Sequence, residues 1–187
     1  MTSFILVLAL AAPGDLASQV KAKLDDAPVQ KGTFESKKQV KGFKRPLVSS
    51  GEYVVNKGEG VKWNTLKPFA SELTVKADEI SNKQGGAEVF RLDANKEPTV
   101  RLITQLLFSL LSGDLATLST HFDAKGEVKE KDWAIELTPK TDGVKKVFTN
   151  IVLKGDRAVR FVTLREASGD VTEITLTPVL PSGVEGK

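Results

Sequence analysis

His121 is the residue on which any Ser–His–Asp hydrolase site in this chain would depend, because the sequence contains one histidine. Ser112, Ser119 and Asp123 lie close to it in the sequence. A serine whose proton passes to an imidazole becomes a nucleophile. The Gly-x-Ser-x-Gly turn that exposes such a serine in many hydrolases is missing, however. We therefore predict that the chain is not an enzyme, and a hydrolase that uses His121 stays as an alternative.

The other residues that could do chemistry fall in incomplete motifs. Ser18 and Lys21 have a Ser-x-x-Lys spacing without the companion motifs of the enzymes that use it. Asp25-Asp26 and Asp78-Glu79 are paired carboxylates, but no histidine or third carboxylate completes a metal site. Gly58-x-Gly60 lacks the third glycine and the following helix of a phosphate loop. The sequence predicts no catalytic residue, no metal and no cofactor.

The composition is that of a soluble globule with a real core. Hydrophobic residues make up 40% of the 187 residues and charged residues 27%, which suits one domain. The 27 basic and 24 acidic residues are interspersed, so we expect no nucleic-acid partner. The absence of cysteine excludes disulfides, thiolate nucleophiles and lipid anchors on cysteine.

The apolar run from Phe4 to Ala12 is too short to span a bilayer, which needs about 20 residues. Its length is typical of the hydrophobic part of a signal peptide, and Ala9-Leu10-Ala11 matches a cleavage pattern. We predict a signal peptide over residues 1–12 and one domain over residues 13–187. The alternative is a buried N-terminal strand.

The segment from Phe34 to Phe69 predicts a succession of short antiparallel strands. Its turns fall at Lys41-Gly42, at 57–60 and at Lys67-Pro68, and no part of it has the period of a helix. Further strands are predicted near residues 72–76 and 87–92. The C-terminal third predicts strands over 133–138, 147–153, 157–165 and 171–178.

Three helices are predicted. Leu16, Val20 and Leu24 form one apolar stripe over residues 15–25. Residues 98–111 carry a much broader apolar face, made by Leu102, Ile103, Leu106, Leu107, Leu110 and Leu111. Gly113 ends that helix, and Asp114 can cap a short one that reaches His121.

The order of these elements predicts an α+β fold with an antiparallel sheet, since no βαβ repeat is visible. A long antiparallel sheet curls strongly, and it then either closes on its own side chains or encloses a cavity. The apolar helix at 98–111 therefore either completes the core or shields a cavity for an apolar ligand. The pattern leaves both open.

Several stretches, taken in order, resemble the LolA-like periplasmic outer-membrane lipoprotein carriers. They are Gly32–Lys38, Arg45–Tyr53, Gly58–Trp63, Pro68-Phe69, Leu107–Leu115 and Trp133–Pro139. The resemblance implies an unclosed, strongly curved antiparallel β-barrel with helices covering its concave face. It implies a monomeric periplasmic carrier that shields the acyl chains of a lipoprotein or another lipid from an inner-membrane donor to an outer-membrane acceptor. The acceptor relatives carry a lipidated cysteine, so this chain is more similar to the soluble carrier.

The resemblance also implies where the ligand binds. An important arginine of the family falls, by order, at Lys57, which keeps the charge but loses the planar fork. The ligand-binding residues predicted for the cavity and its mouth are Lys57, Trp63, Leu102, Leu106, Leu110 and Trp133. The alternative function is a lipid-sensing or regulatory module of the same fold that acts on a protein partner.

Overall fold

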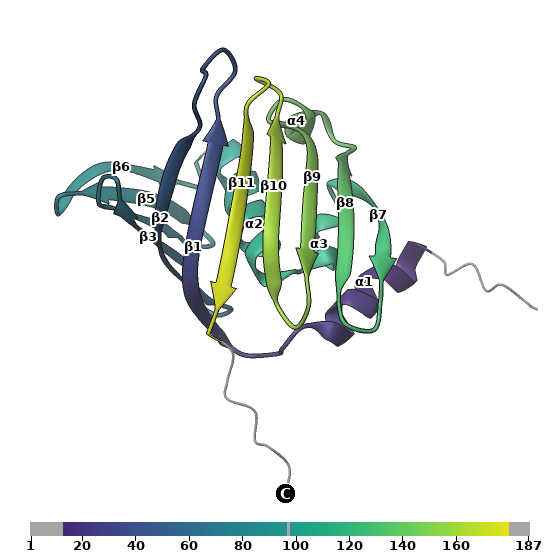
Figure 1. The fold of residues 1–187 in the computed structure, drawn as a ribbon. Coiled ribbons are helices and arrows are strands. Elements are labelled where there is room, and N and C mark those ends of the chain that lie inside the picture. Colours follow the sequence, from purple (N-terminus) through teal and green to yellow (C-terminus); the bar gives the residue numbers. More distant parts are fainter. Residues whose placement is uncertain (1–12, 97, 180–187) are drawn as a thin grey trace, which may run out of the picture.

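The computed structural model describes residues 13–96 and 98–179, and most of them belong to one antiparallel sheet (Figure 1). The first strands are β1 (Val29–Gln39), β2 (Leu47–Asn56), β3 (Gly60–Lys67), β4 (Ser71–Val75), β5 (Glu79–Gln84) and β6 (Ala87–Asp93). The later strands are β7 (Phe122–Val128), β8 (Trp133–Pro139), β9 (Phe148–Gly155), β10 (Val159–Glu166) and β11 (Val171–Pro178). The helices are α1 (Pro13–Lys23), α2 (Pro98–Ser112), α3 (Leu115–Leu118) and α4 (Asp142–Lys145). The predicted signal peptide at 1–12 lies outside the described residues.

The 11-stranded sheet has the order β6-β5-β4-β3-β2-β1-β11-β10-β9-β8-β7. Nearly all neighbouring strands are consecutive in sequence, and β1 joins the two halves by pairing with β11. Strands β6 and β7 form the two edges, so the sheet is not closed, and the connection between these edges contains α2 and α3. The predicted antiparallel sheet of an α+β fold is confirmed.

The two halves of the sheet differ in direction. Figure 1 shows β3 to β6 turning away from the plane of β1 and of β8 to β11. Alternation along the strands sets which side chains face inward: Trp133, Ile135 and Leu137 of β8 are buried, while the residues between them are at least partly exposed. Helix α2 contacts β2, β4, β5 and β10, which belong to both halves.

Helix α2 is more deeply buried than its apolar residues alone predict. Thr104 and Ser109, both expected on the polar side, are only 2% exposed. The Thr104 hydroxyl donates to the carbonyl oxygen of Arg101 at 2.7 Å, which satisfies it within the helix. Only Arg101 and Gln105 among the described middle residues of α2 stay exposed.

The junction after α2 forms as the sequence predicts, but α3 is shorter. Gly113 has φ +70°, a conformation that favours glycine, and it ends α2. The Asp114 carboxylate accepts from the backbone N–H of Thr117 at 3.1 Å and caps α3. The prediction that α3 reaches His121 is wrong, because the helix ends at Leu118 and the chain turns into β7.

Three elements have no counterpart in the predictions. One is strand β5, whose residues are mostly polar. Strand β7 is mostly exposed and contains Gly126, so its sequence has no regular apolar alternation. Helix α4 is one turn long, with Val144 as its buried residue. All three are too short or too polar for periodicity to indicate them.

A close approach of β2 to β3 demands a glycine at position 51. A Cβ atom there would lie 1.9 Å from the carbonyl oxygen of Asn64, which is backbone and cannot move aside cheaply. We therefore expect Gly51→Ala to lower the free energy of unfolding by roughly 1–3 kcal/mol in urea titrations. Gly58→Ala is the matched control, since a Cβ there meets only the side-chain oxygen of Asn56 at 3.7 Å. Equal urea midpoints for the two variants would contradict this account of the β2–β3 contact.

Candidate functional site

An apolar cavity of about 180 Å³ lies between α2 and the inner face of the sheet. Ten of its twelve lining side chains are apolar. The lining consists of Ser36, Ser49, Val61, Trp63, Leu73, Val75, Leu107, Leu110, Leu111, Val162, Leu164 and Ile174. These residues come from α2 and from strands β4, β3, β2, β1, β11 and β10, which are six neighbours in the sheet.

The cavity is evidence for the curvature of the sheet. Six neighbouring strands that lay flat would spread over about 24 Å, at about 4.8 Å between strands. A cavity of this volume can touch all six only if the sheet curls around it. The inner faces of its two halves therefore enclose the same space, with α2 on one side.

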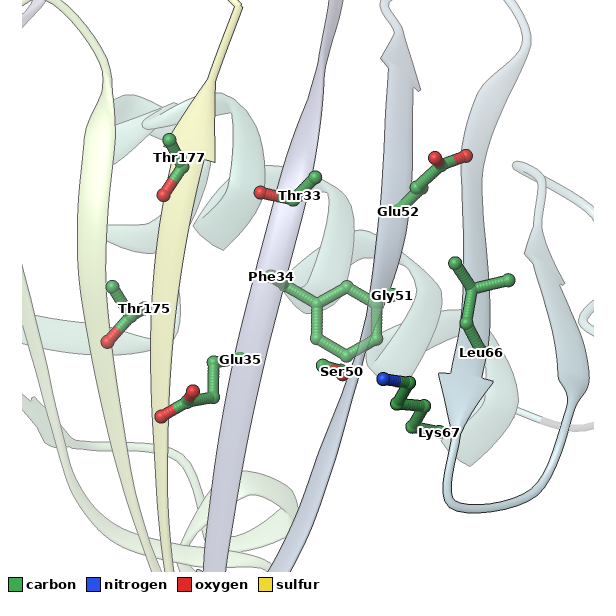
Figure 2. Close-up of a pocket in the computed structure, with 10 residues that line it drawn as sticks. All are labelled: Thr33, Phe34, Glu35, Ser50, Gly51, Glu52, Leu66, Lys67, Thr175 and Thr177. Atoms are coloured by element: carbon green, nitrogen blue, oxygen red, sulfur yellow. The ribbon is translucent and has the colours of Figure 1, made fainter.

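Three neighbouring aromatic rings form an aromatic wall on this side of the cavity, and Trp63 is the one that lines the cavity itself. The ring of Phe34 on β1 stacks on Trp63 of β3 with 3.8 Å between centroids and 26° between ring planes. Trp63 also lies 6.0 Å from Tyr53. Phe34 reaches across β2 at Gly51, its cross-strand partner, which has no side chain to block the ring. Figure 2 shows the Phe34 ring extending from β1 towards Gly51.

The opposite face of the sheet is polar at the same place. Figure 2 shows Thr33, Glu35, Thr175 and Thr177 beside Phe34, and they line a surface groove of about 480 Å³. Thr33 and Glu35 are exposed while Phe34 between them is buried, which is the alternation of a half-buried strand. The groove lacks the convergent buried groups of a ligand site.

Two serines are the polar part of the cavity lining. Ser36 and Ser49 are directly paired across β1 and β2, and both line the cavity. Within the described part of the chain, neither hydroxyl has a hydrogen-bond partner. An unpaired hydroxyl next to an apolar space can donate to a carbonyl or carboxylate oxygen of a ligand.

A charged cluster lies beyond the serines on the same face of β1. Lys38 Nζ is 2.7 Å from Glu166 Oε1 and 3.3 Å from Asp170 Oδ2. The hydrogen bond with Glu166 is the main cause that raises the pKa of Lys38. The Lys41 backbone N–H, which donates to Asp170 at 3.0 Å, is the main cause that lowers the pKa of Asp170. The cluster ties the β10–β11 turn to the β1–β2 hairpin.

The predicted site residues do not all come together. Trp63 and Leu110 line the cavity, and Leu106 is 3% exposed but does not. Leu102 is half-buried beside Gly143 of α4. The Trp133 indole N–H donates to the carbonyl oxygen of Asp156 at 2.8 Å, elsewhere in the core. Binding by any of these residues stays a prediction.

Lys57 lies in a different hollow. Its ammonium group is 2.5 Å from Asp26 Oδ1, and this hydrogen bond is the main cause that lowers the pKa of Asp26. Both residues line a groove of about 690 Å³ between α1, the end of α2 and α3. The groove also has apolar walls, with Phe108 and Leu115 among them.

Sequence reasoning missed most of the residues that line the cavity. They are Ser36, Ser49, Val61, Leu73, Val75, Leu107, Leu111, Val162, Leu164 and Ile174. Alternation along each strand could have found their common face. It could not show that β4 and β10 face the same space.

The groups that a hydrolase would need are not assembled. Ser119 donates to the Ala116 carbonyl oxygen at 2.7 Å and Ser112 to that of Ser109 at 3.5 Å, so neither donates to His121. The Nδ1 atom of His121 is buried without a partner in the described structure. No cluster of potential metal ligands occurs among residues 13–96 and 98–179. Within the same ranges, no helix has both the length and the apolar character to cross a membrane.

Comparison with known proteins identifies relatives of the chain. The sequence model of a family described as outer membrane lipoprotein carrier protein LolA-like matches residues 11–180. Comparison with curated proteins gives no match. A crystal structure of a LolA superfamily protein from Nitrosomonas europaea matches with a TM-score of 0.50 and 10% identity, over 92% of this chain and 95% of that chain. At that identity the likeness shows a shared fold.

Two other solved structures are less similar. A putative outer membrane lipoprotein-sorting protein domain from Vibrio parahaemolyticus has a TM-score of 0.45 and 13% identity, over 91% of this chain and 93% of that chain. A chain of the MucA/MucB complex of Pseudomonas aeruginosa has a TM-score of 0.49 and 16% identity, over 91% of this chain. This protein spans 59% of that longer chain.

The burial of Tyr53 beside Trp63 predicts a measurable titration. Burial raises the pKa of Tyr53 to about 12, because the phenolate is poorly solvated there. Because the pKa of Tyr53 is higher in the folded than in the unfolded protein, Tyr53 makes a pH-dependent contribution to the free energy of unfolding. This contribution is fully present below pH about 10 and is lost as the pH rises towards about 12. The chain has one tyrosine, so absorbance at alkaline pH reports it alone. A midpoint near 10 in folded protein would contradict its burial against the aromatic wall.

Proposed function

This chain belongs to the LolA-like outer membrane lipoprotein carrier family, and from that premise we propose that it is a periplasmic carrier of acylated cargo. It shields the acyl chains of a lipoprotein or another lipid between the inner and the outer membrane. The observation that supports this most is the apolar cavity between α2 and the sheet. Residues 1–12, as a signal peptide, direct export.

The energetics favour a shielded cavity for this task. An acyl chain in water is disfavoured by about 0.8 kcal/mol for each exposed CH₂ group. Trp63, Leu73 and Leu110 offer an apolar surface in place of water. Handover from an inner-membrane donor to an outer-membrane acceptor needs no covalent chemistry, so the proposed carrier is not an enzyme.

The volume of the cavity sets a condition on loading. A dry apolar cavity of about 150 Å³ holds a molecule the size of benzene, and this cavity measures about 180 Å³. It therefore accommodates only a short stretch of an acyl chain as it stands. We propose that α2 covers the concave face and separates from the strands when a longer chain enters.

The polar part of the cavity lining suits the polar end of such a ligand. The hydroxyls of Ser36 and Ser49 can donate to an ester or amide carbonyl where an acyl chain joins its carrier molecule. The chain then runs along Leu107 and Leu110. Lys57 lies in a separate groove. Its ammonium group is proposed to bind an anionic group of the cargo after its ion pair with Asp26 breaks. The carrier acts as a monomer.

Leu107 offers the sharpest test of ligand binding. It is half-buried and lines the cavity, so Leu107→Glu is expected to leave the fold intact while it places a carboxylate against the ligand. We expect its affinity for a fluorescent fatty-acid probe to fall by about tenfold or more, which corresponds to about 1.4 kcal/mol.

Gln105→Glu is the matched control, because it adds the same carboxylate to the exposed side of α2. It should bind the probe as the unchanged protein does. Near-ultraviolet circular dichroism checks that both variants are folded. A folded Leu107→Glu variant with undiminished probe affinity would refute the cavity as the binding site.

A further inference from the structure

The hairpin between β1 and β2 carries an exposed apolar and basic tip. All residues from 41 to 48 are exposed, including Phe43 at 66% and Leu47 at 62%. Figure 1 shows this hairpin extending beyond the ends of the neighbouring strands. Large apolar side chains held in water on a projecting element are typical of an interaction surface.

The tip has a defined shape. The Gln39 side-chain amide donates to the carbonyl oxygens of Phe43 at 2.5 Å and Val40 at 3.2 Å. The Phe43 backbone N–H donates to the Val40 carbonyl oxygen at 3.0 Å, and Asp170 holds the Lys41 N–H. These bonds fix the turn while they leave the Phe43 ring in solvent.

A second hairpin lies at the same end of the sheet. The pairing of Lys38 with Leu47 ends the β1–β2 ladder. The pairing of Ser50 with Lys67 ends the β2–β3 ladder three residues further along β2, or about 10 Å. The β3–β4 turn that follows carries Phe69, which is 82% exposed, and Leu66 before it is also exposed. Two exposed phenylalanines therefore project from adjacent hairpins at one end.

The charged residues of the two tips are all basic. The two tips carry the basic residues Lys41, Lys44, Arg45 and Lys67, all exposed. Positions 40–48 and 66–70 contain no acidic residue. Nearby Glu166 and Asp170 are both paired with Lys38. Aromatic side chains flanked by lysine and arginine complement the surface of an anionic bilayer, where the rings enter the interface and the cations meet phosphates.

We propose that the two hairpin tips, at residues 40–48 and 66–70, form a docking surface for an anionic membrane. Phe43 and Phe69 enter the interface, and Lys41, Lys44, Arg45 and Lys67 contact lipid phosphates. The Ser36–Ser49 pair of the cavity lies two residues below the Lys38–Leu47 pair, or about 7 Å along the strands. Docking by the tips therefore brings the serine pair of the cavity close to the bilayer surface.

Vesicle binding without cargo tests this directly. We expect the full chain to sediment with vesicles of phosphatidylglycerol and phosphatidylcholine in equal parts, more weakly with phosphatidylcholine alone, and less as salt rises. Phe43→Ser combined with Phe69→Ser should lower the partition coefficient by roughly tenfold or more. Lys44→Gln and Arg45→Gln should each lower it by roughly fivefold on the anionic vesicles.

Matched controls come from other parts of the surface. Phe161→Ser removes a phenylalanine that is 50% exposed on β10, and Lys131→Gln removes an exposed charge in the β7–β8 turn. Both should bind vesicles as the unchanged protein does. Equal losses in tip and control variants, or no binding of the unchanged protein to anionic vesicles, would overturn the proposal.

The carrier function and the docking surface fail in different ways. Tip variants should keep their affinity for the fatty-acid probe in the absence of vesicles, because none of the changed residues lines the cavity. If the tip variants bind vesicles normally but lose transfer to a purified protein acceptor, the tips dock a protein and the membrane proposal is wrong. If the unchanged protein does not bind the fatty-acid probe, the carrier function is refuted instead.

Discussion

The packing of α2 against strands from both halves of the sheet is the constraint on which the rest of the structure depends. The helix contacts β4 and β5 in one half and β10 in the other, and it lies in the chain between the edge strands β6 and β7. Leu106 and Leu110 are 3% exposed, which at about 1.5–3 kcal/mol for each buried leucine is a large part of the stability of a domain. The same contact leaves the cavity, because Leu107, Leu110 and Leu111 do not fill the space opposite Trp63 and Leu73.

The aromatic wall shows how a strongly curved sheet keeps one side of this space rigid. Gly51 lets β2 approach Asn64 of β3 more closely than any side chain would allow. It also leaves room for Phe34 to stack on Trp63 from two strands away. Rigid aromatic rings on the sheet side and flexible leucines on the α2 side suit a cavity that opens by movement of the helix. In the proposed carrier, the serine pair would set the direction in which a ligand with one polar end lies.

Much of the fold could be predicted from local pattern, and the site only in part. The 171–178 strand, the helix that starts at Pro98 and the Asp114 cap follow from periodicity and capping chemistry, which act within a few residues. Strand β7 and helix α4 lack such patterns. Trp63 and Leu110 could be chosen as site residues because they are large, apolar and on the right face. Ser36, Ser49 and Val162 could not, since they share a cavity only through the pairing of β1 with β11, an interaction of residues far apart in sequence. Trp133 resembles Trp63 in type and in its place on a strand, but its indole N–H donates to the carbonyl oxygen of Asp156 elsewhere in the core.

Photo-crosslinking with a diazirine-labelled fatty acid, followed by peptide mapping, tests the central claim most directly. The account predicts labelling on α2 around Leu107 and Leu110 together with β3 or β4 around Trp63 and Leu73, and an excess of unlabelled fatty acid should remove it. Labelling confined to exposed apolar residues such as Val89 and Phe161, with none on the inner face of α2, would contradict the claim that the space beneath this helix holds the acyl chain.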